Sequence, residues 1–154
     1  MQLEHVPRIE ALKFCFADAR ASGGQFLNRS FSESQLNALS PATLAYLGDA
    51  VFELFVREQC LFPPQRLQDY HRHVVSQVKA ETQATYARAL IDHLTEPEMD
   101  IFRRGRNSAV GKPKRVSLTI YQYATGFEAL IGYLYLTDVQ RLKALLMLLP
   151  DFDL

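Results

Sequence analysis

Apolar residues recur along most of the chain at spacings of three and four, which is the period of an amphipathic helix. The clearest helix begins at Ser40, which can cap it, with Pro41 in its first turn. It runs on until the Phe62-Pro63-Pro64 sequence stops it. One apolar face is predicted for this helix, made of Leu44, Leu47, Val51, Leu54 and Phe55.

The rest of the pattern is helical as well. Thr95 with Glu98, and Thr137 with Gln140, have the spacing of capping boxes, and Pro150 closes the last helix. No alternation typical of a strand is present, so the sequence predicts an all-α domain over residues 40–150. Residues 1–39 are interpreted as an N-terminal extension, a helix plus a linker. The other predicted helices span about 67–75, 76–93, 95–105, 116–136 and 137–149.

The composition of the chain indicates how many domains it forms and in which environment it is expected to fold. The chain has 154 residues, 48% of them hydrophobic, which suits one domain with its own core. Cys15 and Cys60 lie in apolar helical stretches and are expected to be buried free thiols. Neither a signal-peptide pattern nor an apolar stretch long enough to cross a bilayer is evident. We therefore expect a soluble protein in a reducing compartment, with no membrane partner.

The formal net charge is zero, which by itself does not favour a nucleic-acid-binding protein. The charge is unevenly placed, however, because the segment from Arg103 to Arg115 holds six basic residues and no acidic one. Such a segment can bind phosphate, although a solvated loop is the simpler interpretation. The candidate phosphate-binding residues are Arg103, Arg104, Arg106, Asn107, Lys112, Lys114 and Arg115.

Two carboxylates stand alone in apolar helical surroundings. Asp49 follows Gly48 in the middle of the first long helix, and Glu128 lies between Gly126 and Gly132 in the other. Glycine in mid-helix costs about 1 kcal/mol relative to alanine, which indicates close approach by another backbone or a ligand. Two helices that cross at these glycines would bring Asp49 and Glu128 together.

Such a carboxylate pair suits Mg²⁺, which prefers oxygen ligands and needs only one or two from the protein. The alternative is that each acid forms a buried salt bridge with an arginine. Glu53 shares the helix face of Asp49 and would support it, or else it pairs with Arg57, four residues further on.

The motifs around these acids resemble the ribonuclease III catalytic domain. LAYLGDAVFEL (Leu44 to Leu54) is similar to the signature helix of that family, and FEALIGYLYL (Phe127 to Leu136) to its second catalytic segment. RRGRN (Arg103 to Asn107) and the YxYATGFEAL run resemble the compact Mini-III branch, which lacks a double-stranded-RNA-binding domain. The resemblance covers about residues 40–149.

This resemblance implies a homodimeric helical endonuclease with Asp49 and Glu128 as catalytic residues and Mg²⁺ ligands. It implies hydrolysis of double-stranded RNA by metal-activated water, leaving 5′-phosphate and 3′-hydroxyl ends. The implied substrate is a stem of the large-subunit (23S) ribosomal RNA precursor, with ribosomal proteins as further partners. The implied location is the bacterial cytoplasm or the plastid stroma.

The chain also departs from the longer enzymes of the family. They carry acids at positions that are Ala42, Ala45 and Thr125 here, so only Asp49 and Glu128 carry over as ligands. Thr125 would then hold a water at the metal. Two alternatives are a non-catalytic double-stranded-RNA-binding or ribosome-assembly protein on the same fold, and a helical dimerisation adaptor. The two acids argue against the first, and the basic segment against the second.

Overall fold

A computed structural model describes residues 31–109 and 115–150 of the chain. Every regular element in these ranges is helical, which confirms the predicted all-α class. Predictions for Cys15, Gly111, Lys112 and Lys114 lie outside the described residues. The elements are α2 (Glu33–Asn37), α3 (Pro41–Gln59), α4 (Leu67–Val78), α5 (Ala80–Leu90), the 3₁₀ helix η2 (Ile91–His93), α6 (Glu96–Ser108), α7 (Leu118–Thr137) and α8 (Val139–Leu146).

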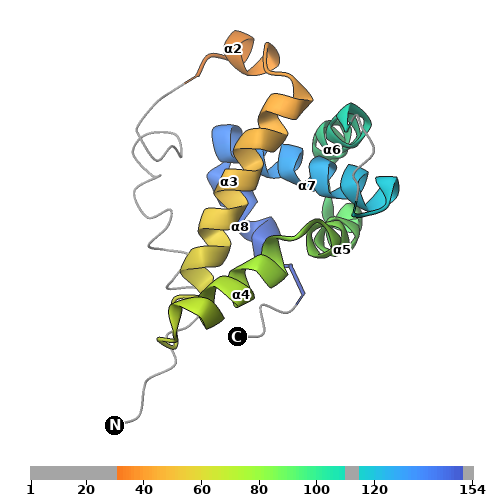
Figure 1. Cartoon of the computed structure of the whole chain (residues 1–154). Helices are drawn as coiled ribbons and strands as arrows, with labels where there is room; N and C mark the ends of the chain where they lie inside the picture. Colours follow the sequence, from red (N-terminus) through yellow and green to blue (C-terminus); the bar gives the residue numbers. More distant parts are fainter. Residues whose placement is uncertain (1–30, 110–114, 151–154) are drawn as a thin grey trace.

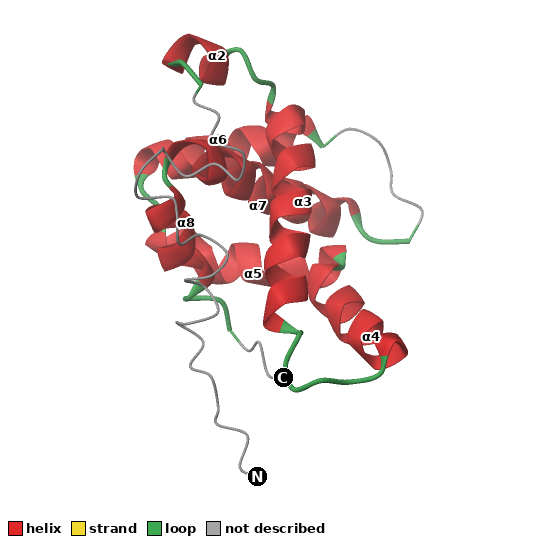
Figure 2. Cartoon of the chain, turned by 90° about the vertical axis from the view of Figure 1, so that its left-hand side faces the viewer, coloured by secondary structure: helices red, strands yellow, loops and turns green. Residues whose placement is uncertain are grey.

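Helix α7 lies at the centre of the molecule, and the other long helices pack around it (Figure 1). Its most extensive contacts are with α3, followed by α6 and α5. Helix α3 crosses α7, as the view turned by 90° also shows (Figure 2). Being covered by several neighbours, α7 is apolar around most of its circumference, and nine of its residues between Ala124 and Leu134 are buried.

The core is built largely from aromatic and branched aliphatic side chains. The Phe52 ring lies edge-on to the Phe127 ring, with 5.0 Å between the centroids, and edge-on to the Tyr86 ring at 6.0 Å. These three rings come from α3, α7 and α5, so each helix contributes one of them. Edge-to-face pairs stabilise the packing beyond the area that they bury, and they fix how the three helices sit against one another.

Several predicted boundaries and faces were wrong. The break between α4 and α5 falls at Lys79, whose backbone is extended, and not after Val75. Leu54 is exposed on α3, whereas Leu44 and Phe55 are buried as predicted, on a face that also includes Gly48 and Phe52. The predicted linker before residue 40 contains the short helix α2.

The ends of α6 and α8 also differ from the prediction. Helix α6 continues past Gly105 to Ser108, because Gly105 packs against α7 and does not form a cap. The first residue of α8 is capped by Asp138, whose carboxylate accepts from the Arg141 N–H at 2.9 Å. Thr137 was the predicted cap, but its hydroxyl donates to the Tyr133 carbonyl inside α7. The predicted capping box of Thr95 and Glu98 is confirmed.

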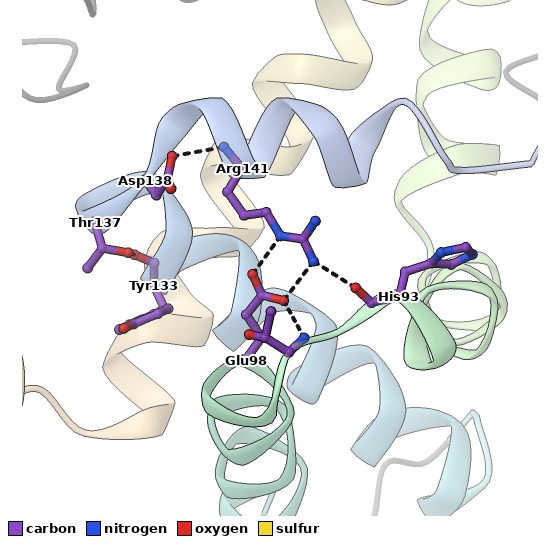
Figure 3. A network of polar contacts seen from close by, with 7 residues as sticks. His93, Glu98, Tyr133, Thr137, Asp138 and Arg141 are labelled. Atoms are coloured by element: carbon purple, nitrogen blue, oxygen red, sulfur yellow. Dashed lines mark hydrogen bonds and ion pairs between the residues drawn. The ribbon is translucent and has the colours of Figure 1, made fainter.

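A buried ion pair joins the start of α6 to α8 (Figure 3). The Arg141 Nε and Nη2 atoms donate to the two oxygens of Glu98 at 2.7 and 2.9 Å, and Nη2 also donates to the His93 carbonyl. Glu98 is only 5% exposed, and the Arg141 hydrogen bonds hold the pKa of its carboxyl below the usual value. This bidentate contact fixes α8 against α6, the helix that carries the basic residues.

We expect Arg141→Met to destabilise the fold by about 2 kcal/mol, because it leaves the buried Glu98 carboxylate without its charged partner. The free energy of unfolding in urea measures this loss. As the control, Arg72→Met removes an ion pair with Asp69 whose two side chains are exposed, and we expect a change below about 0.5 kcal/mol. Equal losses in the two variants would contradict a structural role for the Glu98–Arg141 pair.

Among the described residues, none of the helices combines the length and the apolarity that a bilayer crossing requires. Cys60 is buried and free, as predicted.

Candidate active site

Helices α3 and α7 touch backbone to backbone at two glycines. A Cβ atom on Gly48 would lie 1.8 Å from the backbone oxygen of Glu128, and one on Gly132 would lie 2.1 Å from the backbone oxygen of Leu44. No side chain fits at such distances, so both positions require glycine. The predicted crossing is therefore present, with Gly48 and Gly132 as its contact points.

Gly126 packs against α6, although its position beside Glu128 suggested a contact with α3. A Cβ atom there would meet the Phe102 ring at 2.8 Å and the Phe102 carbonyl oxygen at 2.9 Å, so Gly126 admits α6 and not α3. Gly105 makes the reciprocal contact from α6, where an added Cβ would lie 2.5 Å from the Ala129 Cβ atom. The residues on either side of Glu128 are thus held by α3 on one flank and by α6 on the other.

The crossing brings Asp49 and Glu128 close together. The carboxylate of Asp49 follows Gly48 directly, and its charge is one of the causes that raise the pKa of Glu128. Asp49 is exposed, whereas Glu128 is partly buried between the helices. Asp49 is therefore the more accessible carboxylate of the pair, and Glu128 is the less accessible one.

The surroundings of Asp49 and Glu128 raise the pKa of both carboxyl groups. Burial, and then the charge of Asp49, raise the pKa of Glu128 to about 8. Burial also raises the pKa of Asp49, to which the charge of Glu53 adds a smaller contribution. Within residues 31–109 and 115–150, no lysine or arginine forms an ion pair with Asp49 or Glu128. The salt-bridge alternative for these two acids is therefore wrong over the described part of the chain.

A third polar side chain, which the sequence did not single out, completes the cluster. Gln83 of α5 is 1% exposed, and its Nε2 atom donates to Asp49 Oδ1 at 3.4 Å. A hydrogen bond from Gln83 also acts on Glu128, where it lowers the pKa against the larger effects of burial and Asp49. The only signal in the sequence is one amide in an alanine-rich helix, which does not reveal where that helix packs.

The residues present fit a divalent cation. Two neighbouring carboxylates that have no basic partner among the described residues and are disfavoured as anions gain from a bound dication, and oxygen ligands suit Mg²⁺. Over the described ranges, no group of three or more histidines, cysteines and acids could hold a metal. Asp49 and Glu128 would be the protein ligands of such an ion, and water or substrate oxygens would complete the coordination.

Glu53 and Thr125, the two predicted supporting residues, have other partners. Arg57 donates from Nε to the Glu53 carboxylate at 3.0 Å, which confirms the pairing alternative for Glu53. Thr125 is buried and donates its hydroxyl hydrogen to the Tyr121 carbonyl at 3.0 Å. Because that hydrogen is already used, Thr125 can meet a water at the site only as an acceptor.

The first part of the basic segment, from Arg103 to Ser108, belongs to α6, whereas the sequence predicted a loop from Gly105 onward. Arg103, Arg104 and Asn107 are exposed on α6, and Arg106 is half-buried. Gly105 between them packs on α7, so its N–H is not free to approach phosphate, contrary to the expectation. Arg115 is exposed in the segment before α7. Since Gly105 touches α7 beside Ala129, the arginines around it lie next to the part of α7 that carries Glu128.

We expect the metal-free protein to lose stability as the pH rises from about 5 to about 8. The pKa of Glu128 is about 8 in the fold and near 4.5 when unfolded, so the native state binds the proton more tightly and loses this advantage on ionisation. Thermal unfolding in chelator at a series of pH values measures the effect. In Glu128→Gln the slope should largely disappear, and an unchanged slope would contradict the assignment.

Comparison with known proteins connects this geometry to a family. A model of the ribonuclease III domain matches residues 42–138, which include both α3 and α7. The chain is 59% identical over 111 residues to a protein named Mini-ribonuclease 3 from Thermosynechococcus vestitus, covering 72% of this chain and 74% of that one. It is 50% identical to a protein of the same name from Synechocystis, covering 82% of this chain and 96% of the relative.

The fold also resembles a solved structure. The crystal structure of protein FN1578 from Fusobacterium nucleatum superimposes with a TM-score of 0.67 at 30% sequence identity, covering 70% of this chain and 90% of that one. The matched family region contains Asp49, Glu128 and the glycines at which their helices cross.

Proposed function

The chain belongs to the ribonuclease III family and is an endoribonuclease, and from this premise we propose that it cuts double-stranded RNA with Mg²⁺ held by Asp49 and Glu128. The observation that carries the proposal is the pair itself, two adjacent carboxylates at a glycine-lined helix crossing, with no basic partner in residues 31–109 and 115–150. When bound, Mg²⁺ supplies a Lewis acid that activates water and offsets the charge of an in-line phosphoryl displacement.

Different residues of the chain have different roles in the proposed site. Glu128, which is partly buried between the helices, anchors the site, and the exposed Asp49 faces the side from which RNA approaches. The rings of Phe52, Phe127 and Tyr86 pack below and keep α3, α7 and α5 in register. With two protein ligands, the site depends on phosphate oxygens of the substrate, so RNA binding and metal binding support each other.

The exposed basic residues of α6 bind the RNA backbone in this proposal. A-form RNA is recognised mainly through its phosphates and 2′-hydroxyls, which suit arginine and asparagine side chains. Arg103, Arg106 and Asn107 lie three and four residues apart and share one side of the helix. Lys112, Lys114 and Arg115 extend the same positive charge along the sequence.

We expect the double variant Arg104→Gln/Arg106→Gln to bind duplex RNA more weakly and with a smaller salt dependence. Each lost phosphate contact should reduce the slope of log affinity against log salt by about one. A filter-binding or fluorescence titration in chelator at several salt concentrations measures this. Arg66→Gln is the control, since Arg66 is exposed beside α4, at the other end of the molecule from α6 (Figures 1 and 2). Unchanged affinity in the double variant at low and high salt would contradict the proposed RNA contacts of Arg104 and Arg106.

We further propose that the protein forms a homodimer. Tyr46 and Leu54 are 86% and 46% exposed, and they lie eight residues apart on α3, on the same side of the helix. A large aromatic and a leucine on one exposed helix face favour an apolar partner, and a second copy would bring two active sites onto one duplex. We also propose that the substrate is the 23S ribosomal RNA precursor stem, in the bacterial cytoplasm or plastid stroma, where ribosomal proteins would be further partners.

The proposed activity is tested with matched nucleic acids. The purified protein is incubated with Mg²⁺ and one sequence as RNA duplex, RNA single strand or DNA duplex, and the product ends are mapped. We expect cleavage of the RNA duplex alone, with 5′-phosphate and 3′-hydroxyl ends. Cleavage of single strands at an equal rate would overturn the duplex specificity, and binding without any cleavage would favour the non-catalytic alternative.

A further inference from the structure

Gln83 is a buried amide directly beside the two catalytic carboxylates. It comes from α5, whereas Asp49 and Glu128 come from α3 and α7, so it is the contribution of a third helix to the site. It is 1% exposed, which is rare for glutamine unless its polar atoms have partners. Its amide nitrogen has two hydrogens and donates one of them to Asp49, while the Gln83 side chain also lowers the pKa of the neighbouring Glu128 carboxyl.

The other end of the amide is unusual. Gln83 Oε1 is buried and has no hydrogen-bond partner within the described structure. An orphaned buried acceptor costs stability, so a leucine of similar size would serve the packing of α5 better. The position therefore favours an amide for a reason other than packing.

We infer that Gln83 is a positioning residue for the metal site, whose amide holds the carboxylates of Asp49 and Glu128 side by side in the orientation that a divalent cation requires. The inference rests on the proposed function and adds a residue to it. The 3.4 Å separation from Asp49 is longer than the roughly 2.7–2.9 Å of a strong charged hydrogen bond. The amide therefore places the carboxylate and still leaves its lone pairs free for a cation.

The local packing supports this role. Tyr86 follows Gln83 by one helical turn, and its ring packs edge-on against Phe52, which follows Asp49 by the same interval. Phe127, the neighbour of Glu128, packs against Phe52 in turn. Each polar residue of the cluster thus has an aromatic residue near it in sequence, and these three rings pack together.

The test compares Gln83→Leu with Gln83→Glu. Leucine removes the donor, and we expect about ten times more Mg²⁺ at half-saturation, both for duplex cleavage and for the Mg²⁺-induced rise in melting temperature without RNA. Glutamate replaces the donor with a third carboxylate, and we expect Mg²⁺ to bind more tightly than to wild type. A merely structural role would move both variants in the same direction through lost stability. RNA affinity in chelator should stay within about twofold of wild type in both.

Gln59→Leu is the matched control. Gln59 is also a buried glutamine, 8% exposed, whose Nε2 atom has no partner, but it lies ten residues beyond Asp49 on α3, or about 15 Å. Its Mg²⁺ half-saturation should equal that of wild type. A Gln83→Leu value within twofold of wild type, or equal shifts for Gln83→Leu and Gln83→Glu, would overturn the inference. If wild type itself shows no response to Mg²⁺, the proposed metal dependence fails instead.

Discussion

Gly48→Ala is expected to reduce RNA cleavage by at least about a hundredfold and to destabilise the fold by about 2 kcal/mol. The new Cβ atom would lie 1.8 Å from the backbone oxygen of Glu128, so α3 and α7 must move apart by more than an ångström. Overpacking of this kind costs about 1–3 kcal/mol or more, against a gain of about 1 kcal/mol in helix propensity. A misplacement of about 1 Å between reacting groups can itself cost a factor of about 100 in rate.

The measurements are urea unfolding and the cleavage rate at saturating RNA, at a temperature where the variant is fully folded. Gly105→Ala is the control, because its Cβ atom would clash between α6 and α7 and leave the α3–α7 crossing intact. We expect that variant to lose stability with a much smaller loss of rate. Wild-type stability and activity in Gly48→Ala would contradict the backbone contact on which the site is built.

Glu128→Gln is expected to abolish cleavage and, at the same time, to stabilise the metal-free protein. Losing one of two protein ligands should remove most of the several kcal/mol that a metal supplies to phosphoryl transfer, a drop of about a thousandfold or more in rate. The neutral amide avoids burying a group whose pKa is raised to about 8, which should stabilise the fold at pH 7 by up to about 3 kcal/mol.

The opposite signs make this prediction specific. Replacing a residue that only supports the fold should lower activity and stability together. Replacing a metal ligand that destabilises the metal-free fold should lower activity and raise stability. Glu53→Gln is the control, because Glu53 pairs with Arg57 on the exposed side of α3, and we expect less than a tenfold change in rate. A Glu128→Gln variant with near-normal cleavage would remove Glu128 from the catalytic site.

Much of the fold could be predicted because local signals determine it. Ser40 with Pro41 set the start of α3, and Thr95 with Glu98 set the start of α6, since caps act within one turn. The exposure of Leu54 and the passage of α6 through Gly105 could not be predicted. Both depend on which helix packs where, and hydrophobic spacing does not specify that when several faces are apolar.

The candidate site, like the fold, could be predicted from the sequence only in part. Asp49 and Glu128 could be found because lone acids beside glycines in apolar helices are costly, so the sequence itself marks them. Gln83 could not be found, since an uncharged amide in an alanine-rich helix costs little until the helix is packed. That the described part of the chain places no basic partner beside the carboxylates is likewise a property of the packing, and it favours the metal interpretation over the salt bridge.

The central claim, that Asp49 and Glu128 jointly hold the Mg²⁺ with which this protein cuts double-stranded RNA, is tested most directly by one comparison. A long RNA duplex is incubated with wild type in Mg²⁺, with wild type in chelator, and with Asp49→Asn in Mg²⁺. We predict cleavage in the first reaction alone, with the Asp49→Asn protein folded and still bound to the duplex. An intact duplex with wild type in Mg²⁺, or equal cutting by Asp49→Asn, would contradict the account.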